Sequence, residues 1–502
     1  MPGYNSVIGG LISGHLLSKQ AGIQTSPAWP CDGPLLDLAE KFADKLLPAF
    51  NTNTHLPYGT VNLKHGKVPT NETTVTCVAG VGTFLLEFGM LSRLTGDKRY
   101  ERAAINALKS IWKYRSDIGL LGNHIDIQTG QWTASDSTIG SGTDSIFEYL
   151  IKGSAMFNIP ELHAMFLEYK KSIDKHLSYG DWYLMANKDT GQVTMPVFQS
   201  LEAFWPGVLI LHGEIQKAIE LLVNYHRVWK KYGSFPELFT VTSDTTPSNH
   251  AAYPLRPEFI ESVMYAYHAT GDKRMLEIGA DFLYAIEKIT KTRCGFATIH
   301  DVTTHELEDR MESFFLAETT KYLYLLFDTE NFFHRQATSG AGFRVDMPSG
   351  KTCRIGAGGF IMNTEAHILD PGAIDCCYSS VSTHFPSEYD SEKGQTNESN
   401  SIIKGGIYHS MKMSLNLTSE TFEELREDIQ SILSSKDSDK LNRDLASVYL
   451  DTLSILKDSN SWFEENIDRL NIRKIERTQP LMTCPYPSFV ERVFAINAYE
   501  HT

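Results

Sequence analysis

The chain has 502 residues, which is long enough for one large domain plus an appendage. Its hydrophobic content of 42% is normal for a protein with a sizeable core. The net charge of −15 argues against a nucleic-acid-binding surface, and no apolar run reaches membrane-spanning length. We therefore expect no nucleic-acid partner and no transmembrane segment.

The first 17 residues, MPGYNSVIGGLISGHLL, are apolar and resemble the interior part of an amphipathic helix. They contain neither a basic n-region nor a small-residue cleavage site, so we expect no signal peptide within this chain. A fold that starts in the middle of a helix indicates that its front end is missing.

Helical hairpins are predicted to follow. Residues 34–49 and 77–94 show helical periodicity, and the second stretch ends at the turn TGDKR, residues 95–99. The same pentapeptide recurs at 270–274, again between two helical stretches. Gly96 and Gly271 would end the first helix of each pair in the left-handed conformation. The repeat predicts an array of helical hairpins.

Short β-like stretches lie between these hairpins, at 56–63 and 123–133, and would cap one end of a helical barrel. The periodic region closes at NTEAHILDP, residues 363–371. Residues 378–410 are rich in Ser, Glu and Gly and predict a flexible segment, and a capping box at Thr421 and Glu424 predicts a helix after it. We expect one domain over 1–371 and an acidic, partly disordered and partly helical tail over 372–502.

The stretch LRPEFIES, residues 255–262, places charge at the start of an apolar helix. Pro257 suits the first helical turn, Glu258 and Glu261 share one helix face, and Arg256 stands just outside. Stabilisation of the helix dipole by the two acids is the alternative explanation.

Further acids occur at comparable positions. Asp144 and Glu148 are four residues apart on one predicted helix, Gly140 and Gly142 precede them, and Glu237 follows a proline. Four acids lie in apolar sequence, where an unpaired carboxylate is costly: Glu148 again, with Glu87, Glu318 and Glu365.

Many acids directed at one cavity indicate cations, waters or sugar hydroxyls as partners. Oxygen ligands without clustered Cys or His favour Ca²⁺ over Zn²⁺. Phe314 lies four residues before Glu318, where it would either stack under a sugar ring or belong to the core. Glycoside hydrolysis, in which one carboxylic acid protonates the leaving oxygen and a second acts as base or nucleophile, fits such a cavity.

Seven cysteines and three N-x-S/T sequons, at Asn71, Asn397 and Asn416, favour an oxidising lumen over the cytosol. The odd number of cysteines leaves at least one thiol free or paired with a partner.

Several long motifs, in order along the chain, carry a resemblance. GTDSIFEYLIKG, LRPEFIES, RMESFFLAETTKYLYLLF and NTEAH resemble the class I α-mannosidases, glycoside hydrolase family 47, over about residues 5 to 370. WPCDGPLLDLAE, LPYGTVNLKHG, SDIGLLGNHID and MPVFQSLEAFWPG resemble its subfamily of ER degradation-enhancing α-mannosidase-like proteins. This resemblance implies an all-α fold, an (α/α)₇ barrel with short β-hairpins at one end, whose first helical hairpin is missing here.

The resemblance also implies a Ca²⁺-dependent, inverting α1,2-mannosidase in the lumen of the endoplasmic reticulum. It would trim high-mannose N-glycans on misfolded glycoproteins and so mark them for degradation. Glu258 would be the general base, Asp144 and Glu237 the other catalytic acids, and Thr364 the residue that binds Ca²⁺ directly. Arg256 and Phe314 would contact the glycan. The acids that hold the waters and substrate around the ion would be Glu87, Glu148, Glu261, Glu318 and Glu365.

Three positions depart from the family pattern. Pro2 stands where the family has its acid Glu, Ser6 where it has Arg, and Ile368 where it usually has Pro after NTEAH. The family also has a helical hairpin and a signal peptide upstream. We expect the chain to be a fragment of an active enzyme. The alternative is a catalytically silent, glycan-binding adaptor of the same pathway.

Cys484 lies remote from the predicted barrel. The odd number of cysteines and the family setting make it a candidate for a mixed disulfide with an oxidoreductase. The alternative is an internal pair with Cys376 or Cys377.

Overall fold

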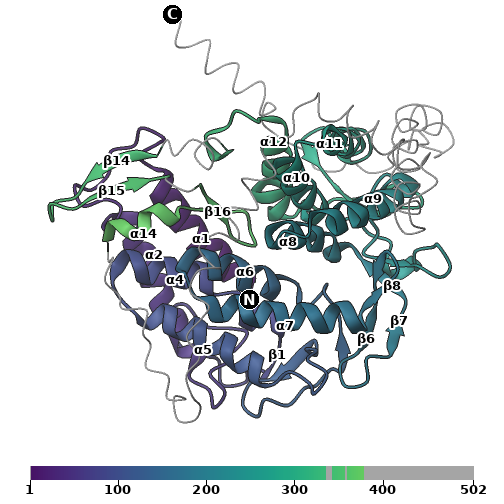
Figure 1. Cartoon of the computed structure of the whole chain (residues 1–502), viewed down its shortest axis with the longest axis horizontal. Coiled ribbons are helices and arrows are strands. Elements are labelled where there is room, and N and C mark those ends of the chain that lie inside the picture. The colour runs from purple at the N-terminus through teal and green to yellow at the C-terminus, as the bar shows by residue number, and fades with distance from the viewer. Residues whose placement is uncertain (1, 335–341, 357–358, 378–502) are drawn as a thin grey trace, which may run out of the picture. The chain divides into compact units, whose positions relative to one another are not determined.

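A computed structural model describes residues 2–334, 342–356 and 359–377 of the chain. These residues divide into two compact units, each described here by itself: unit 1 comprises 2–212 and 327–377, and unit 2 comprises 213–326. Both are built mainly of helices (Figure 1). The predicted tail begins at 372, and its part from 378 onward lies outside the described residues, so the predicted domain boundary stays a prediction.

Helices and short strands alternate in unit 1. Its helices are α1 (Pro2–Leu17), α2 (Pro34–Leu46), η1 (Leu47–Phe50), α3 (Val78–Gly82), α4 (Leu85–Thr95), α5 (Arg99–Lys113), α6 (Asp144–Phe157), α7 (Pro160–His176), η2 (Ser200–Phe204), α8 (Trp205–His212) and α14 (Pro371–Cys377). Its strands are β1 (Val75–Cys77), β2 (His124–Asp126), β3 (Asp136–Ser137), β4 (Ser178–Tyr179), β5 (Trp182–Tyr183), β6 (Met185–Asn187), β7 (Val193–Met195), β8 (Val197–Gln199), β14 (Phe343–Asp346), β15 (Thr352–Ile355), β16 (Ile361–Met362) and β17 (Ile368–Leu369).

Helix α1 confirms the helix predicted at the start of the chain. It packs beside α2 and against α4 and the β16–β17 hairpin (Figure 1). Gly9 makes the close approach to the hairpin, since a Cβ there would stand 2.5 Å from Asn363 Nδ2. Ile368, the position at which the resemblance predicts a proline, donates its backbone N–H to Ser13 Oγ at 3.1 Å. A proline at this position would lack that N–H.

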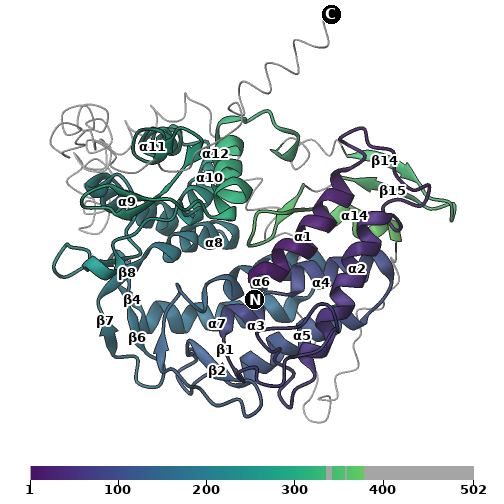
Figure 2. The ribbon, with the colours of Figure 1, turned by 180° about the vertical axis from the view of Figure 1, so that it is seen from behind.

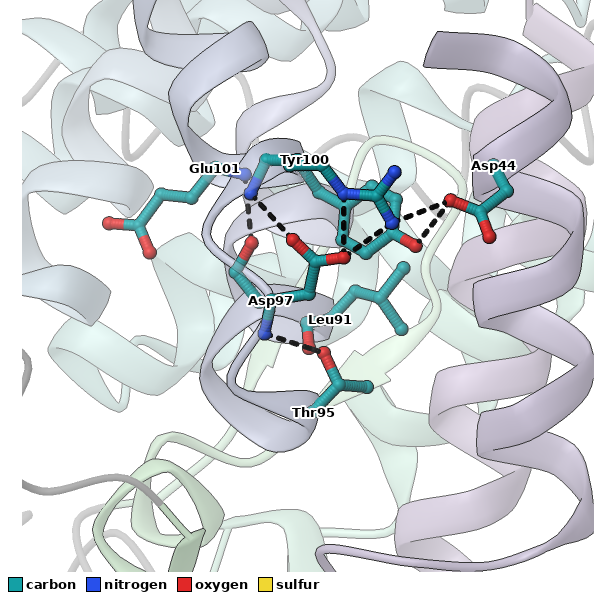
Figure 3. A network of polar contacts seen from close by, with 8 residues as sticks. Asp44, Leu91, Thr95, Asp97, Tyr100 and Glu101 are labelled. Carbon is teal, nitrogen blue, oxygen red and sulfur yellow. Dashed lines mark hydrogen bonds and ion pairs between the residues drawn. The ribbon is translucent and has the colours of Figure 1, made fainter.

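The first TGDKR turn joins α4 to α5 and also ties both to α2 (Figure 3). Gly96 is left-handed at φ 84° and its N–H bonds Ser92 O, which confirms the predicted helix end. Asp97 accepts from Arg99 N at 2.9 Å. Asp44 of α2 then accepts from Arg99 Nη2 and from the Tyr100 hydroxyl, both at 2.9 Å.

The single helix predicted over 77–94 is broken into α3 and α4. Thr83 leaves the helical conformation at φ −113° and ψ 45°. Its carbonyl accepts from Asn5 Nδ2 of α1 at 2.6 Å, and its hydroxyl oxygen accepts from the same amide at 3.1 Å. A long-range side-chain hydrogen bond thus replaces the helical one, which periodicity alone does not reveal.

Short antiparallel pairs connect the helices of unit 1. They are β1–β2, β3–β6–β7, β4–β5, β14–β15 and β16–β17. The stretch predicted over 123–133 contains β2, whose Ile125 also bridges to Trp132. The stretch predicted over 56–63 forms no strand and makes one isolated bridge, between Asn62 and Lys67.

Two disulfides meet at α14. Cys377 bonds Cys31, 346 residues away, and Cys376 bonds Cys353 of β15. The internal pairing of Cys484 with Cys376 or Cys377 is therefore wrong. Cys294 is also disulfide-bonded, and Cys77 is the free cysteine among the described residues. Within these residues, none of the helices is long and apolar enough to cross a membrane.

Unit 2 repeats the helical pattern (Figure 2). Its helices are α9 (Ile215–Tyr232), η3 (Ser248–His250), α10 (Glu258–Thr270), α11 (Lys273–Ala285), the π-helices η4 (Ile286–Thr290) and η5 (Phe315–Thr319), and α12 (Thr320–Phe327). Its strands are β9 (Leu238–Thr240), β10 (Lys291–Thr292), β11 (Gly295–Phe296), β12 (Thr298–Asp301) and β13 (Glu306–Glu308), with β10–β11 and β12–β13 paired.

The second TGDKR turn joins α10 to α11, as predicted. Gly271 is left-handed at φ 67°, and Asp272 caps α11 by accepting from Arg274 N at 3.0 Å. Buried aromatic rings fill the unit, with Trp229 stacked on Phe282 at a centroid distance of 4.3 Å. Helix α10 begins at Glu258, so Pro257 is its N-cap rather than its first residue.

Candidate functional site

Asp144 is the first residue of α6, and a hydroxyl relay joins it to Thr364. The Ser145 hydroxyl donates to Asp144 Oδ1 at 2.8 Å and lies 2.9 Å from Thr364 Oγ1. Because the single Ser145 proton serves Asp144, the Thr364 hydroxyl is the donor in the second bond. The relay fixes the proton of Thr364 toward Ser145 and leaves its oxygen lone pairs available.

Glu87 of α4 is a buried acceptor. Its Oε1 accepts from the Tyr149 hydroxyl and from Asn363 Nδ2, both at 2.6 Å. Its Oε2 is buried and has no hydrogen-bond partner among the described residues. Burial raises the pKa of Glu87 to about 7, although both hydrogen bonds act to lower it.

Glu148 lies one helical turn after Asp144 and is buried with Lys152. The Lys152 ammonium donates to Glu148 Oε1 and, at 2.9 Å, to the carbonyl of Met362. A buried carboxylate needs such a partner. The ammonium thereby also attaches α6 to the β16–β17 hairpin.

The turn Asn363–His367 is organised by the Asn363 side chain. Its Oδ1 accepts from Glu365 N at 3.0 Å and from His367 N at 2.8 Å. Ala366 is held at φ 55°, a conformation that a residue with a Cβ seldom adopts. Glu365 is hydrogen-bonded to Ser6, the position at which the resemblance predicts an arginine, and burial raises the pKa of Glu365.

The oxygen donors of this turn fit Ca²⁺. Thr364 offers a hydroxyl oxygen whose proton is engaged elsewhere. Glu87 Oε2, which has no hydrogen-bond partner among the described residues, could accept a hydrogen bond from a water molecule bound to the ion. The described residues contain no group of three His, Cys, Asp or Glu that could enclose a metal, so an ion here would depend mainly on water and ligand oxygens.

Unit 2 gathers the residues of LRPEFIES with those of two other segments. Arg256 donates from Nε to Glu237 Oε1 at 2.8 Å and from Nη2 to Glu237 Oε2 at 2.9 Å. Its Nη1 lies 3.8 Å from Glu258 Oε1. Its guanidinium also sits 5.8 Å from the centre of the Phe314 ring, which is half-buried. One arginine therefore positions two of the predicted catalytic acids.

The backbone beside Arg256 is strained. Leu255 is fully buried at φ 64°, and its carbonyl accepts from the Thr319 hydroxyl at 2.8 Å. Such strain persists where the surroundings fix it, often at functional positions. Thr319 ends the π-helix η5, a form that is itself frequent at functional sites.

The remaining predicted acids of unit 2 are buried. Glu261 is 8% exposed on α10 and Glu318 is 6% exposed within η5. Lys321 faces Glu318, although burial still lowers the pKa of Lys321. Glu261 lies on α10 with Glu258, and Glu318 lies in η5, whose N-cap is Phe314.

The predicted site residues thus form two groups. In unit 1, Ser145 connects Asp144 to Thr364, Asn363 donates to Glu87, and Lys152 connects Glu148 to the carbonyl of Met362. In unit 2, Arg256 joins Glu237, Glu258 and Phe314. The roles assigned to these residues stay predictions.

Four further residues complete the unit 1 group and were not predicted: Ser145, Tyr149, Lys152 and Asn363. A signal existed for Lys152, since it follows Glu148 by four residues on a helix. Asn363 is a residue type that often bonds the backbone two residues on. Tyr149 gave no signal, because its role depends on a neighbour 62 residues away.

The chain matches the sequence profile of glycosyl hydrolase family 47 over residues 6–370. It is 55% identical over 371 residues to the human "ER degradation-enhancing alpha-mannosidase-like protein 2", a match covering 74% of this chain and 64% of that relative. It is 45% identical over 364 residues to "Alpha-mannosidase I MNS4" of Arabidopsis thaliana, covering 72% and 55%. The chain thus spans less than two thirds of these relatives.

The fold is similar to that of "alpha-1,2-mannosidase from Trichoderma reesei", with a TM-score of 0.61 and 27% identity over 72% of this chain and 80% of that one. Together with the helical hairpins and short β-hairpins of the two units, this confirms the predicted fold class, an all-α protein of the α/α-barrel type.

Proposed function

The chain belongs to glycosyl hydrolase family 47, and we propose that it is a Ca²⁺-dependent, inverting α1,2-mannosidase of the endoplasmic reticulum lumen. Its substrates would be high-mannose N-glycans on misfolded glycoproteins, whose trimming directs them to degradation. The observation that carries the proposal is the Arg256 cluster, in which one guanidinium holds Glu237 in two hydrogen bonds and faces Glu258 and Phe314.

Glu258 would act as the general base of the reaction. Glu258 lies at the first position of α10, where the positive end of the helix dipole favours a negative charge, and it would accept a proton from the attacking water. Arg256 would hold the orientation of Glu237 and Glu258, and Phe314 would offer its ring to a sugar face. Asp144, held by Ser145, would be the third acid.

Thr364 would bind the Ca²⁺, and Glu87, Glu148 and Glu365 would hold waters around it. When bound, the ion would fix the hydroxyls of the terminal mannose and so orient the sugar ring. Burial of Glu87 and Glu148 at 1% and 4% exposure means that neither side chain reorganises freely when substrate arrives.

The test is release of mannose from a Man₉ glycan by the purified full chain, compared with Glu258→Gln. We expect release by the wild type and a loss of roughly 10²- to 10⁴-fold in the variant, the usual contribution of a general base. Glu161→Gln, an exposed acid on α7, is the control and should match the wild type.

A silent glycan-binding adaptor is the second candidate, favoured by Pro2 at the position of the family's acid. It predicts that the full chain binds the Man₉ glycan, that Arg256→Ala abolishes binding, and that no mannose is released. Release of mannose by the wild type would exclude it.

We also propose a disulfide-linked oxidoreductase partner through Cys484, which lies outside the described residues. Since Cys294 is disulfide-bonded, an intramolecular pair is the competing outcome. Non-reducing gels and peptide mapping of the wild type and Cys484→Ser separate the two. A high-mass band that persists in the variant would remove Cys484 as the link.

A further inference from the structure

Glu202 is a buried carboxyl group of unit 1 that the proposed mechanism leaves unused. It lies in η2 and is 1% exposed. Its Oε1 accepts from the Thr138 hydroxyl at 3.1 Å, whereas its Oε2 is buried without a hydrogen-bond partner among the described residues. An ionised carboxylate in such a place is costly, so its surroundings call for a neutral group.

The contacts of Glu202 lead to the turn that precedes Asp144. Thr138 Oγ1, which donates to Glu202, accepts from Gly140 N at 3.0 Å and from Gln199 Nε2 at 3.2 Å. Gln199 Oε1 in turn accepts from Ser141 N at 3.0 Å. The side chains of Thr138 and Gln199 thus accept hydrogen bonds from the backbone N–H groups of Gly140 and Ser141 in the turn.

The turn then closes on Asp144 itself. The carbonyl of Gly140 accepts from Asp144 N at 2.9 Å, and the Thr143 hydroxyl donates to Thr138 O at 2.6 Å. Gly140 is required for this packing, because a Cβ at that position would stand 2.8 Å from Glu202 Cγ. A change in the charge or side chain of Glu202 would therefore affect the position of Asp144, through the hydrogen bonds of the turn and the close contact between Gly140 and Glu202.

We propose that Glu202 is a positioning residue that works as a neutral carboxylic acid and fixes the turn from which Asp144 enters the site. This inference rests on the proposed function, since it gives Asp144 a role in mannose cleavage. Among the described residues, Glu202 is hydrogen-bonded to Thr138 and to the Gln199 backbone, so it would act through the turn.

The electrostatic surroundings agree with a neutral group. Burial raises the pKa of Glu202 to about 8, while hydrogen bonds from Thr138 and from the Gln199 backbone lower it. The titratable groups on the helices packed against η2 are Asp144, Glu148, Tyr149, Lys152 and His212, and none of them contributes to the raised pKa. No cation among the described residues therefore offsets the charge that appears when the proton leaves.

The expected consequence is a loss of activity in alkali. Above pH 8 the Glu202 carboxylate forms and attracts the hydrogen-bond donors of Thr138 and Gln199. The hydrogen bonds that these residues make to the turn would then weaken. The pKa of Glu202 is raised above that of the unfolded chain, so its stabilising contribution is complete below pH 4.5 and is lost as the pH rises through about 8. Glu202→Gln keeps the neutral acceptor and removes the titration.

The experiment compares kcat on a Man₉ glycan for the full-length wild type, Glu202→Gln and the exposed-acid control Glu168→Gln between pH 6 and 9.5. We expect Glu202→Gln to match the wild type at pH 6.5 and to exceed it about tenfold at pH 9, where most of the wild-type carboxyl groups have lost their proton. Glu168, with a side chain 66% exposed, should follow the wild type throughout. An unchanged ratio across pH, or a folded Glu202→Gln that is inactive at pH 6.5, overturns the proposal.

A second readout does not require activity. The melting temperature of Glu202→Gln should rise relative to that of the wild type between pH 5 and 8, and that of Glu168→Gln should not. A protein that shows this difference but releases no mannose would contradict the proposed function and leave the neutral state of Glu202 intact. The pair Thr138→Ser and Thr138→Val completes the design, because only loss of the hydroxyl should lower kcat while KM stays constant.

Discussion

The guanidinium of Arg256 holds the carboxylate of Glu237 by two parallel hydrogen bonds, 2.8 Å from Nε to Oε1 and 2.9 Å from Nη2 to Oε2. A lysine cannot reproduce this fork. We expect Arg256→Lys to lower kcat/KM on a Man₉ glycan by about 10²-fold, the effect of an ångström-scale misplacement. Arg99→Lys removes a comparable exposed pair with Asp97 and should leave kcat/KM unchanged. Full activity of Arg256→Lys would mean that the fork has no role.

Removal of Ca²⁺ by a chelator and replacement of Thr364 should both abolish the stabilisation of the fold by Ca²⁺. Ca²⁺ at a hundredfold excess over its Kd stabilises a folded protein by about 2.7 kcal/mol, so the melting temperature should rise by several degrees on addition of Ca²⁺ to the chelated wild type. Thr364→Ala should lose this rise. Thr320→Ala on α12, where the hydroxyl donates only to the carbonyl of Leu316 one turn earlier, should keep it. An equal rise with Mg²⁺, or none with Ca²⁺, would contradict the assignment of Thr364.

His15 should make the fold sensitive to acid. Its Nε2 lies 2.9 Å from the carbonyl of Pro30, and burial lowers its pKa. Because the unfolded chain binds the proton more readily than the folded one, the stability contribution of His15 is present above pH 6.5 and is lost as the pH falls. His15→Gln keeps a donor and does not titrate, so its free energy of unfolding should fall less between pH 7 and 5.

Urea unfolding at the two pH values measures this difference. The matched control is His300→Gln, whose side chain is 63% exposed. It should lose as much stability as the wild type on acidification. A parallel loss in His15→Gln would show that other groups cause the acid sensitivity.

Glycosylation of Asn71 should show whether the chain reaches the lumen of the endoplasmic reticulum. Asn71 is exposed in a turn in which Glu72 N bonds Pro69 O, and Thr73 of its sequon is exposed as well. In the lumen of the endoplasmic reticulum we expect an N-glycan at this position. Digestion with an endoglycosidase should then increase gel mobility for the wild type and Thr73→Ser, which keeps the sequon, by one step more than for Asn71→Gln. Identical shifts in all three proteins would place Asn71 outside the modified sites.

The two disulfides at α14 should differ in what they contribute to stability. Cys31–Cys377 closes a loop of 346 residues, and Cys353–Cys376 closes one of 23. The loss of chain entropy on closing such loops gives about 6 and about 3 kcal/mol, respectively. The double serine variant of the first pair should therefore have the lower free energy of unfolding, measured by urea denaturation. The reverse order would indicate that native-state contacts outweigh loop entropy.

The features that sequence predicted are local ones. Gly96 and Gly271 end helices because the left-handed conformation suits glycine, and Asp144 and Glu148 share a face because helical geometry requires it. Partners distant in sequence were not predictable from pattern. Asn5 breaks the helix at Thr83, and Cys376 and Cys377 choose partners that no spacing rule identifies. The roles of the acids came from resemblance, whereas their hydrogen bonds came from the structure.

The disulfide between Cys31 and Cys377 can form only late in synthesis of the chain. A ribosome adds roughly 5–20 residues per second, so the thiol of Cys31 waits roughly 20–70 s before Cys377 has even been made. During that interval the Cys31 thiol can pair with cysteines that are made before Cys377, among them Cys77 and Cys294. Correct closure therefore requires that Cys31, which lies between α1 and α2, stays unpaired until α14 of unit 1 has been made.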